Sequence, residues 1–254
     1  MNTNKYAIFL DIDNTLMVNG EIPQGNIDAI KKAQKDGHLV FINTGRSFSY
    51  IPKKLTEAID FDGFVAGIGS DIRVHNKQIF SHSIPMDELL KIAKYFENDS
   101  REIGFEGEEK TIWINPKDFR EDPYILTSPE DFNSIYANEK ISMIYIGDKL
   151  TSDEVIMFSK KNSVFVHENY SEFVPTGFNK GDCMIMAAEH VGIPITNCIA
   201  MGDSTNDTDM LKMAGISVAM GDAVDEIKSI CSFISCDAKD CGVAFAINHF
   251  LFNS

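Results

Sequence analysis

Four aspartates and a lysine are the side chains of this sequence that could do chemistry together. Asp11 and Asp13 end the apolar run "YAIFLDIDNTL", and Asp203 and Asp207 lie in "NCIAMGDSTND". Alternate residues of an extended strand face the same side, so Asp11 and Asp13 would place two like charges together. That arrangement is costly unless a cation lies between them or the chain turns after Asp11. The spacing therefore predicts either a cation site or a sharp turn at the end of this strand.

The elements around these aspartates alternate between strand and helix patterns. Apolar runs predict strands at residues 6–12, 38–45, 63–69, 197–203, 216–221 and 232–235. Helical spacing predicts helices at 26–37, 54–63, 180–192, 206–215, 223–231 and 242–251. This order is typical of a doubly wound, Rossmann-like parallel sheet with right-handed crossovers. Ligands bind beyond the carboxyl ends of such strands, so all four aspartates and "NTGR" at 43–46 should meet at one edge.

The middle of the chain breaks this rhythm. Residues 70–84 read as a hairpin that turns at Asn76-Lys77, and strands outnumber helices from there to about 178. We expect a core domain at 1–82 and 179–254 and an inserted α+β domain at 83–178. The polar, proline-rich stretch 115–134 is expected to be surface loop.

Composition excludes several classes of protein. The net charge of −15 argues against non-specific binding to nucleic acid or to an anionic membrane. The N-terminal apolar run is short and charged, unlike a signal peptide, and nothing resembles a spanning helix, so we expect a soluble cytoplasmic protein. The five cysteines do not suggest a disulfide framework. We expect Cys231, Cys236 and Cys241 to be reduced core thiols, because their spacing fits no zinc pattern.

The clustered residues suit phosphoryl chemistry. Carboxylates that meet at a sheet edge favour a hard cation such as Mg²⁺. Thr44, the Gly45 amide and Lys180, which opens the helix after the insert, suit phosphate oxygens. One carboxylate could attack phosphorus to form an aspartyl-phosphate, and a second could move the proton of the leaving oxygen.

These motifs resemble those of phosphatases of the haloacid dehalogenase superfamily, in the Cof-like branch that carries a large α+β cap. "DIDNTL" matches the first motif of that branch and "NTGR" the second; Lys180 in "NKGD" matches the third and "GDSTNDTDML" the fourth. The likeness covers nearly the whole chain and is weakest over the insert. It implies that the insert is a cap domain and that the activity is Mg²⁺-dependent hydrolysis of a phosphomonoester.

The resemblance also implies a role for each matching residue. Asp11 would be the nucleophile, Asp13 the general acid and base, and Lys180 a ligand of the phosphoryl oxygens. Mg²⁺ would be held by Asp11, by the backbone carbonyl of Asp13 and by Asp203.

The remaining motif residues would support these. Asp207 would hold the metal indirectly or through water, and Thr44 and Gly45 would bind phosphate. Asn206 would contact phosphate or orient its loop. Arg46 would bind phosphate or form a surface ion pair.

Two positions depart from the pattern of the branch. Asn14 stands where glycine is usual, and asparagine tolerates a left-handed turn almost as well. Asp222 stands where asparagine is usual, which adds a negative charge near the sheet edge. Neither change removes a catalytic group.

Two other functions stay open. A phosphomutase of the phosphomannomutase type shares this core and cap, but it needs more cationic residues in the cap than Arg101 and Arg120. A phosphate-binding regulatory protein could keep the fold without turnover. The expected substrate is a small phosphorylated metabolite such as a sugar phosphate. Polar residues of the stretch 106–113 are the candidates for selecting it.

Overall fold

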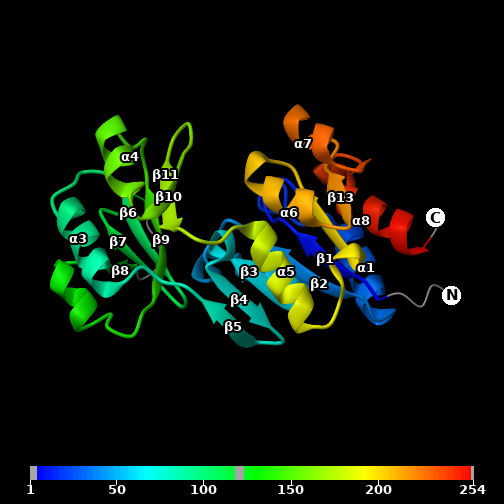
Figure 1. Cartoon of the computed structure of the whole chain (residues 1–254), viewed down its shortest axis with the longest axis horizontal. Helices are drawn as coiled ribbons and strands as arrows, with labels where there is room; N and C mark the ends of the chain where they lie inside the picture. The colour runs from blue at the N-terminus through cyan, green and yellow to red at the C-terminus, as the bar shows by residue number, and fades with distance from the viewer. Residues whose placement is uncertain (1–4, 118–122, 253–254) are drawn as a thin grey trace. The chain divides into compact units, whose positions relative to one another are not determined.

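The computed structural model describes residues 5–117 and 123–252. The chain divides into two compact units (Figure 1). We call the first, Met1–Gly45, Pro52–Ile79 and Phe178–Ser254, the core unit. The second, Arg46–Ile51 and Phe80–Gly177, is the cap unit. The short segment Arg46–Ile51 therefore belongs with residues far away in the sequence.

The core unit is built on one sheet. Its strands are β1 (Ala7–Leu10), β2 (Leu39–Asn43), β3 (Gly63–Ala66), β4 (Asp71–Val74), β5 (Lys77–Ser81, whose last two residues pass into the cap unit), β12 (Cys198–Gly202), β13 (Ile216–Ala219) and β14 (Phe233–Ile234). Their order is β14-β13-β12-β1-β2-β3-β4-β5. Pairing is parallel from β14 to β3, and β4 is antiparallel to β3. The prediction of a doubly wound parallel fold is confirmed.

Helices cover both faces of this sheet (Figure 1). They are α1 (Gln24–Lys35), α2 (Lys53–Ala58), α5 (Lys180–His190), α6 (Thr208–Met213), α7 (Asp225–Ile230) and α8 (Gly242–Ile247). The helix α1 packs against α8, and α5 packs against α6. In α1, Ile30 and Ala33 are buried while the lysines at 31, 32 and 35 are exposed. Such a one-sided apolar stripe is what docks a helix on a sheet.

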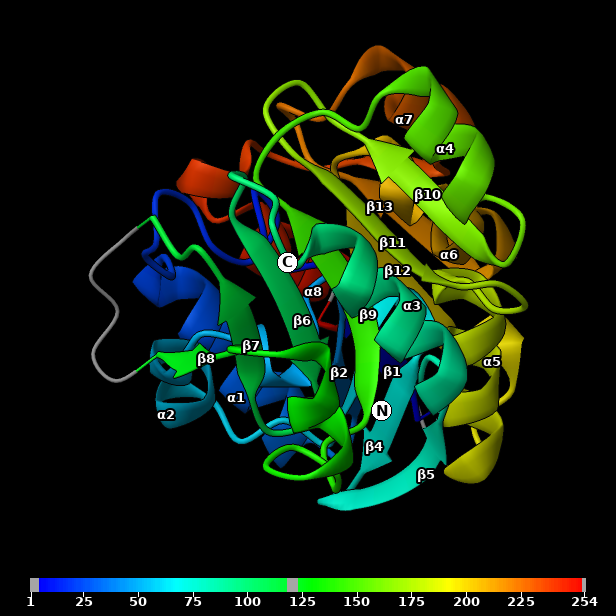
Figure 2. The ribbon, with the colours of Figure 1, turned by 90° about the vertical axis from the view of Figure 1, so that its left-hand side faces the viewer.

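The cap unit has a sheet of its own (Figure 2). Its strands are β6 (Ile103–Gly107), β7 (Thr111–Ile114), β8 (Tyr124–Ile125), β9 (Ile141–Ile146), β10 (Asn162–Val166) and β11 (Ser171–Pro175), in the order β10-β11-β9-β6-β7-β8. The helices α3 (Met86–Phe96) and α4 (Ser152–Phe158) lie over it. Phe96, Phe105, Phe132 and Phe173 centre the core between them. The expected α+β cap is confirmed.

Two local expectations are wrong. The hairpin turns at His75-Asn76, where φ is 47° and 62°, one residue before the expected position. Part of the stretch 115–134 is not surface loop, because Leu126 and Phe132 are buried in the core of the cap unit. Ser128 caps a short 3₁₀ turn that begins at Pro129, which directs Phe132 inward. Residues 118–122 of this stretch lie outside the described residues.

Across residues 5–117 and 123–252, no helix has the length and apolarity that a membrane span requires. The five cysteines are free thiols. Cys183 and Cys198 are buried, whereas Cys231, Cys236 and Cys241 are half-buried. The expectation that these three lie in the core is therefore only partly met.

Candidate active site

The ends of two neighbouring strands bring the first carboxylates together. Asp11 follows β1 and its N–H donates to the carbonyl of Met201 in β12 at 3.1 Å. Asp203 follows β12, and Asp207 lies in the short turn after it. Carboxylate oxygens of Asp11, Asp203 and Asp207 all lie within 4.8 Å of one another. Residues 192 positions apart in the sequence, 203 minus 11, thus share one site.

Lys180 lies at the centre of this cluster. Its side chain is fully buried, and Nζ donates to Asp11 Oδ1 at 2.8 Å and to Asp207 Oδ1 at 2.7 Å. A longer contact of 3.4 Å joins Nζ to Asn206 Oδ1. The lysine is the first residue of α5, whose N-terminus is capped by the Asn179 side chain, which accepts from the Asp182 N–H. This hydrogen bond of Asn179 starts the helix at Lys180 and so fixes the direction of the lysine side chain.

Asp207 is held on both of its oxygens. While Oδ1 accepts from Lys180, Oδ2 accepts from the N–H groups of Asp203 and Ser204 at 3.1 and 3.2 Å. Its carboxylate packs directly on Gly202, where a Cβ would lie 2.5 Å from Asp207 Cγ. Only glycine leaves that space, so Gly202 permits the carboxylate to orient both its loop and Lys180.

The electrostatics of the cluster favour an added cation. Burial raises the pKa of Asp11 to about 7, although Lys180 opposes that rise. Burial, and next the charge of Asp207, raise the pKa of Asp203 to about 6. Burial opposes the charge of Lys180, but attraction to Asp11 and Asp207 outweighs it and raises the lysine pKa. Three carboxylates share a single buried ammonium, so the residues present fit a divalent cation.

The rest of the first motif turns away from the strand. Asn14 adopts φ of 54°, the left-handed conformation that its side chain tolerates. This turn leaves the Asp13 side chain exposed and buries Thr15 completely. Thr15 Oγ1 donates to Asp203 Oδ1 at 3.1 Å, so it orients a candidate metal ligand. The sharp turn predicted at the end of this strand is therefore present, and it keeps Asp11 and Asp13 from lying on one strand face.

Asp222 lies at the edge of the cluster. It is exposed, and its carboxylate accepts from the Ala238 N–H at 3.1 Å. Its charge adds to the rise in the Asp203 pKa, after burial and Asp207. The extra negative charge therefore raises the pKa of Asp203 from a distance. Asp222 is not one of the clustered carboxylates, which are Asp11, Asp203 and Asp207.

The second motif supplies the candidate phosphate-binding turn. Thr44 is buried, and its N–H donates to the carbonyl of Val65 at 2.9 Å, which extends β2 by one residue. A Cβ on Gly45 would lie 3.7 Å from Asn206 Nδ2, so the second and fourth motifs meet here. Arg46 follows this turn directly in the chain. It belongs to the cap unit, where Nη1 donates to the carbonyl of Tyr50 at 3.4 Å.

Sequence reasoning missed two features next to this turn. Asn43 is fully buried and its Nδ2 donates to the carbonyl of Lys180 at 3.0 Å, tying β2 to the start of α5. Gly67, Ile68 and Gly69 all have positive φ, of 59°, 57° and 102°. Such a run is strained at Ile68 and is a mark of functional loops. The two glycines at the end of the predicted strand 63–69 were the available signal.

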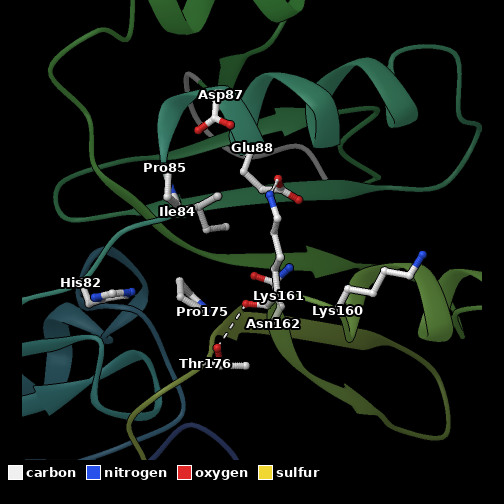
Figure 3. Close-up of a pocket in the computed structure, with 10 residues that line it drawn as sticks. All are labelled: His82, Ile84, Pro85, Asp87, Glu88, Lys160, Lys161, Asn162, Pro175 and Thr176. Atoms are coloured by element: carbon white, nitrogen blue, oxygen red, sulfur yellow. Dashed lines mark hydrogen bonds and ion pairs between the residues drawn. The ribbon is translucent and has the colours of Figure 1, made fainter.

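The cap unit contains a cavity of about 410 Å³ (Figure 3). Charges of both signs line it, from Asp87 and Glu88 on α3 and from Lys160 and Lys161. Lys161 forms an ion pair with Glu88, and the Thr176 hydroxyl donates to the Lys161 carbonyl at 3.4 Å. This balanced lining offers no excess positive charge to a phosphate, so the cavity is a weaker candidate site than the Asp11 cluster.

The stretch 106–113 runs from strand β6 through a turn into strand β7. The Glu139 carboxylate fixes this turn, because it accepts from the N–H groups of Glu109 and Lys110 at 2.7 and 3.2 Å. Glu106 is instead the unusual residue, since it is 3% exposed. Ser47 Oγ donates to its Oε2 at 2.6 Å. Burial raises the pKa of Glu106 to about 7, and the Ser47 hydrogen bond partly offsets the rise.

This raised pKa predicts a pH dependence of stability. A carboxyl whose pKa rises on folding stabilises the fold below its ordinary value of 4.5, and that contribution is lost as the pH rises through about 7. Relative to Glu106→Gln, the unchanged protein should lose roughly 3 kcal/mol of unfolding free energy over this window. Urea unfolding of both proteins at several pH values measures the difference. Asp11 and Asp203 titrate in both proteins, so their effects cancel in it. Parallel curves would contradict the expectation.

Comparison with known proteins places the chain in a family. Residues 8–247 match the family of haloacid dehalogenase-like hydrolases. The chain therefore belongs to this family, and within it the chain is a phosphatase. The resemblance drawn from the motifs is confirmed.

Individual relatives cover almost the whole chain. Two are 5-amino-6-(5-phospho-D-ribitylamino)uracil phosphatases of Bacillus subtilis (strain 168). YcsE is 28% identical over 250 residues, with 96% of this chain and 95% of YcsE covered. YitU is 27% identical over 277 residues, with 96% and 97% covered. The subclass IIB sugar phosphatase BT4131 superposes with a TM-score of 0.81 at 24% identity, over 97% of this chain and 99% of BT4131. A haloacid dehalogenase-like hydrolase from Bacteroides thetaiotaomicron gives 0.85 at 22%, over 98% and 100%.

Proposed function

We propose that the protein is a Mg²⁺-dependent phosphomonoester hydrolase that acts through an aspartyl-phosphate on Asp11. One observation carries the proposal above the others. Lys180 is fully buried and its Nζ lies 2.8 Å from Asp11 and 2.7 Å from Asp207. A buried lysine with two carboxylates is a costly arrangement for stability alone, and it is well suited to the charge of a transferring phosphoryl group.

The metal would be held by Asp11, by the backbone carbonyl of Asp13 and by Asp203. Asp207 would support it indirectly, because both of its oxygens already accept hydrogen bonds. Thr15 would keep Asp203 in place through its 3.1 Å hydrogen bond. When bound, the cation would neutralise charge on the phosphoryl oxygens and on the surrounding carboxylates.

The residues of the chain then divide the chemistry. A carboxylate oxygen of Asp11 attacks phosphorus, and the bond from phosphorus to the leaving oxygen breaks. Asp13 gives its proton to that oxygen. In the second step Asp13 takes a proton from water, the water oxygen attacks the aspartyl-phosphate, and Asp11 leaves with inorganic phosphate released. Lys180, Thr44 and the Gly45 amide hold the phosphoryl oxygens, with Asn206 bordering the turn.

The substrate we propose is a small phosphorylated metabolite, with sugar phosphates first. The names of the relatives support this class, because they act on a phosphoribityl compound and on sugar phosphates. The net charge of −15 is unsuited to a nucleic-acid substrate.

Hydrolysis is favoured over a phosphomutase reaction by the state of Arg101. Its guanidinium donates to Asp99 and Glu154 of the cap unit at 2.7 and 2.5 Å. The paired charge is committed to holding the cap unit together, so it is not available to a second phosphate. Arg120, the other candidate cation, lies outside the described residues.

Metal removal tests the proposal. We expect EDTA to abolish hydrolysis of sugar phosphates and Mg²⁺ to restore it. Ca²⁺ should inhibit, because it takes more ligands at longer distances than a site of few carboxylates allows. A screen of phosphorylated metabolites with each metal measures this. Full activity after exhaustive chelation, or in Ca²⁺ alone, would contradict the proposal.

The role of Asp13 gives a separate prediction. Asp13→Asn should still bind substrate, because the proposed metal contact of Asp13 is its backbone carbonyl. Turnover of an alkyl phosphate should fall by about 10²–10⁴-fold, since the leaving oxygen loses its proton donor. An activated aryl phosphate needs less protonation and should lose less. Rates with both substrates decide the matter, and equal losses would speak against proton transfer by Asp13.

A further inference from the structure

The segment Arg46–Ile51 joins the core unit to the cap unit along the chain. It follows directly on Thr44 and Gly45, the proposed phosphate-binding turn of the core unit, and yet its own contacts place it in the cap unit. Ser47 is 1% exposed and donates to Glu106 at 2.6 Å. Ser49 and Thr111 are joined by a second hydroxyl contact of 3.2 Å. The two contacts fall on residues paired across the β6–β7 hairpin, because Glu106 lies opposite Thr111.

A buried carboxyl at this place has no evident purpose in packing. Among the described residues, Glu106 accepts its hydrogen bond from the hydroxyl of Ser47. The charge of Glu172, on β11, adds to the raised pKa of Glu106, and the charge of Arg46 lowers it only as the smallest of the named effects. An apolar side chain would avoid the desolvation cost. Buried polar groups that are kept in spite of their desolvation cost concentrate at functional positions.

The Ser47–Glu106 hydrogen bond lies close along the chain to the phosphate-binding turn. Ser47 is two residues from Gly45, and consecutive Cα atoms are about 3.8 Å apart. Fixing Ser47 therefore restricts where the Gly45 amide and Thr44 can lie. Ile68 restricts the same turn within the core unit, because its N–H donates to the Thr44 carbonyl at 3.2 Å.

We propose that Glu106 is a positioning residue for the phosphate-binding turn Thr44–Gly45 and acts on it through Ser47. The inference rests on the proposed function, because it takes that turn to bind phosphate. It assigns to Glu106 a part in holding the phosphoryl group common to all substrates. Selection of one leaving group, the role expected for the stretch 106–113, is a different task and predicts different results.

Binding of inorganic phosphate in the presence of Mg²⁺, measured by calorimetry, tests the proposal without turnover. Ser47→Ala and Glu106→Ala should each raise the Kd about tenfold, the effect of losing one hydrogen bond to a buried carboxyl. Glu106→Gln keeps an acceptor for Ser47 and should bind phosphate within about twofold of the unchanged protein. Rescue by this conservative variant separates positioning from a general loss of stability.

Ser171→Ala is the matched control. Ser171 is fully buried in the cap unit, and its Oγ accepts from the Leu150 N–H at 2.9 Å. The variant therefore also loses one buried hydrogen bond, but away from Ser47 and Glu106. Its Kd for phosphate should not change. Unfolding curves confirm that each variant is folded during the titrations.

The outcomes are distinct. If folded Ser47→Ala and Glu106→Ala bind phosphate as tightly as Ser171→Ala does, the proposal is overturned. Losses confined to kcat/KM for one metabolite, with the phosphate Kd unchanged, would also overturn it and make Glu106 a leaving-group selector. If the protein binds phosphate, the variants weaken binding and no phosphomonoester is hydrolysed, the proposed function fails while this inference stands.

Discussion

Asp11→Asn should lose turnover by about 10⁴-fold or more while it stays folded. Asparagine keeps the shape of the side chain but lacks the nucleophilic carboxylate. Burial raises the pKa of Asp11 to about 7, so its charge is unfavourable in the fold without a metal. Removing that charge leaves Lys180 paired with Asp207 and relieves repulsion among the carboxylates. We therefore expect thermal stability without Mg²⁺ to be unchanged or higher.

This combination separates the nucleophile from a structural aspartate. Single-turnover assays with a sugar phosphate and thermal unfolding without metal measure the two effects. Asp28→Asn, the same exchange on an exposed residue of α1, is the control and should change neither. An Asp11→Asn variant that keeps more than a few per cent of the activity would rule Asp11 out as the nucleophile.

Lys180→Met should destabilise the protein by about 3–5 kcal/mol at neutral pH without Mg²⁺. Methionine matches the length of the side chain but leaves the buried carboxylates of Asp11 and Asp207 without their ammonium partner. The deficit should shrink when Mg²⁺ is added, because a cation that binds only the folded state stabilises it. It should also shrink as the pH falls, because protonation removes the uncompensated charges.

Urea unfolding with and without Mg²⁺ measures this effect. Lys161→Met is the matched control, because Lys161 forms its ion pair with Glu88 at the surface and should contribute little. Equal stability of Lys180→Met and the unchanged protein without metal would mean that the carboxylates do not depend on the lysine. The activity of Lys180→Met should be lost even where Mg²⁺ restores the fold.

Much of the site could be predicted because it depends on the order of strands. Asp11 and Asp203 end apolar runs that had to be neighbours in a parallel sheet, and β1 does pair with β12. Lys180 could be placed at a helix start from the helical pattern that follows it. These inferences need only local patterns and the rule that parallel strands share a carboxyl edge.

The parts that could not be predicted depend on contacts between distant residues. Nothing near Asn43 in the sequence indicates that its amide reaches the carbonyl of Lys180. Nothing near Ser47 indicates Glu106 as its partner. Ile68 was expected to continue a strand, because isoleucine favours strands, but it lies between two glycines and takes φ of 57°. Tertiary context overrode local preference at each of these positions.

The membership of Arg46–Ile51 in the cap unit has a consequence for engineering new specificity. A chimera that receives a foreign cap at 83–178 would keep its own Ser47 and Ser49, which would then face a hairpin that did not evolve with them. The transplantable module is discontinuous, since it also includes the hexapeptide 46–51. Recombination between relatives at the two obvious linkers would separate the pieces, so exchange of both together is the design that preserves Glu106 with its hydroxyl donor.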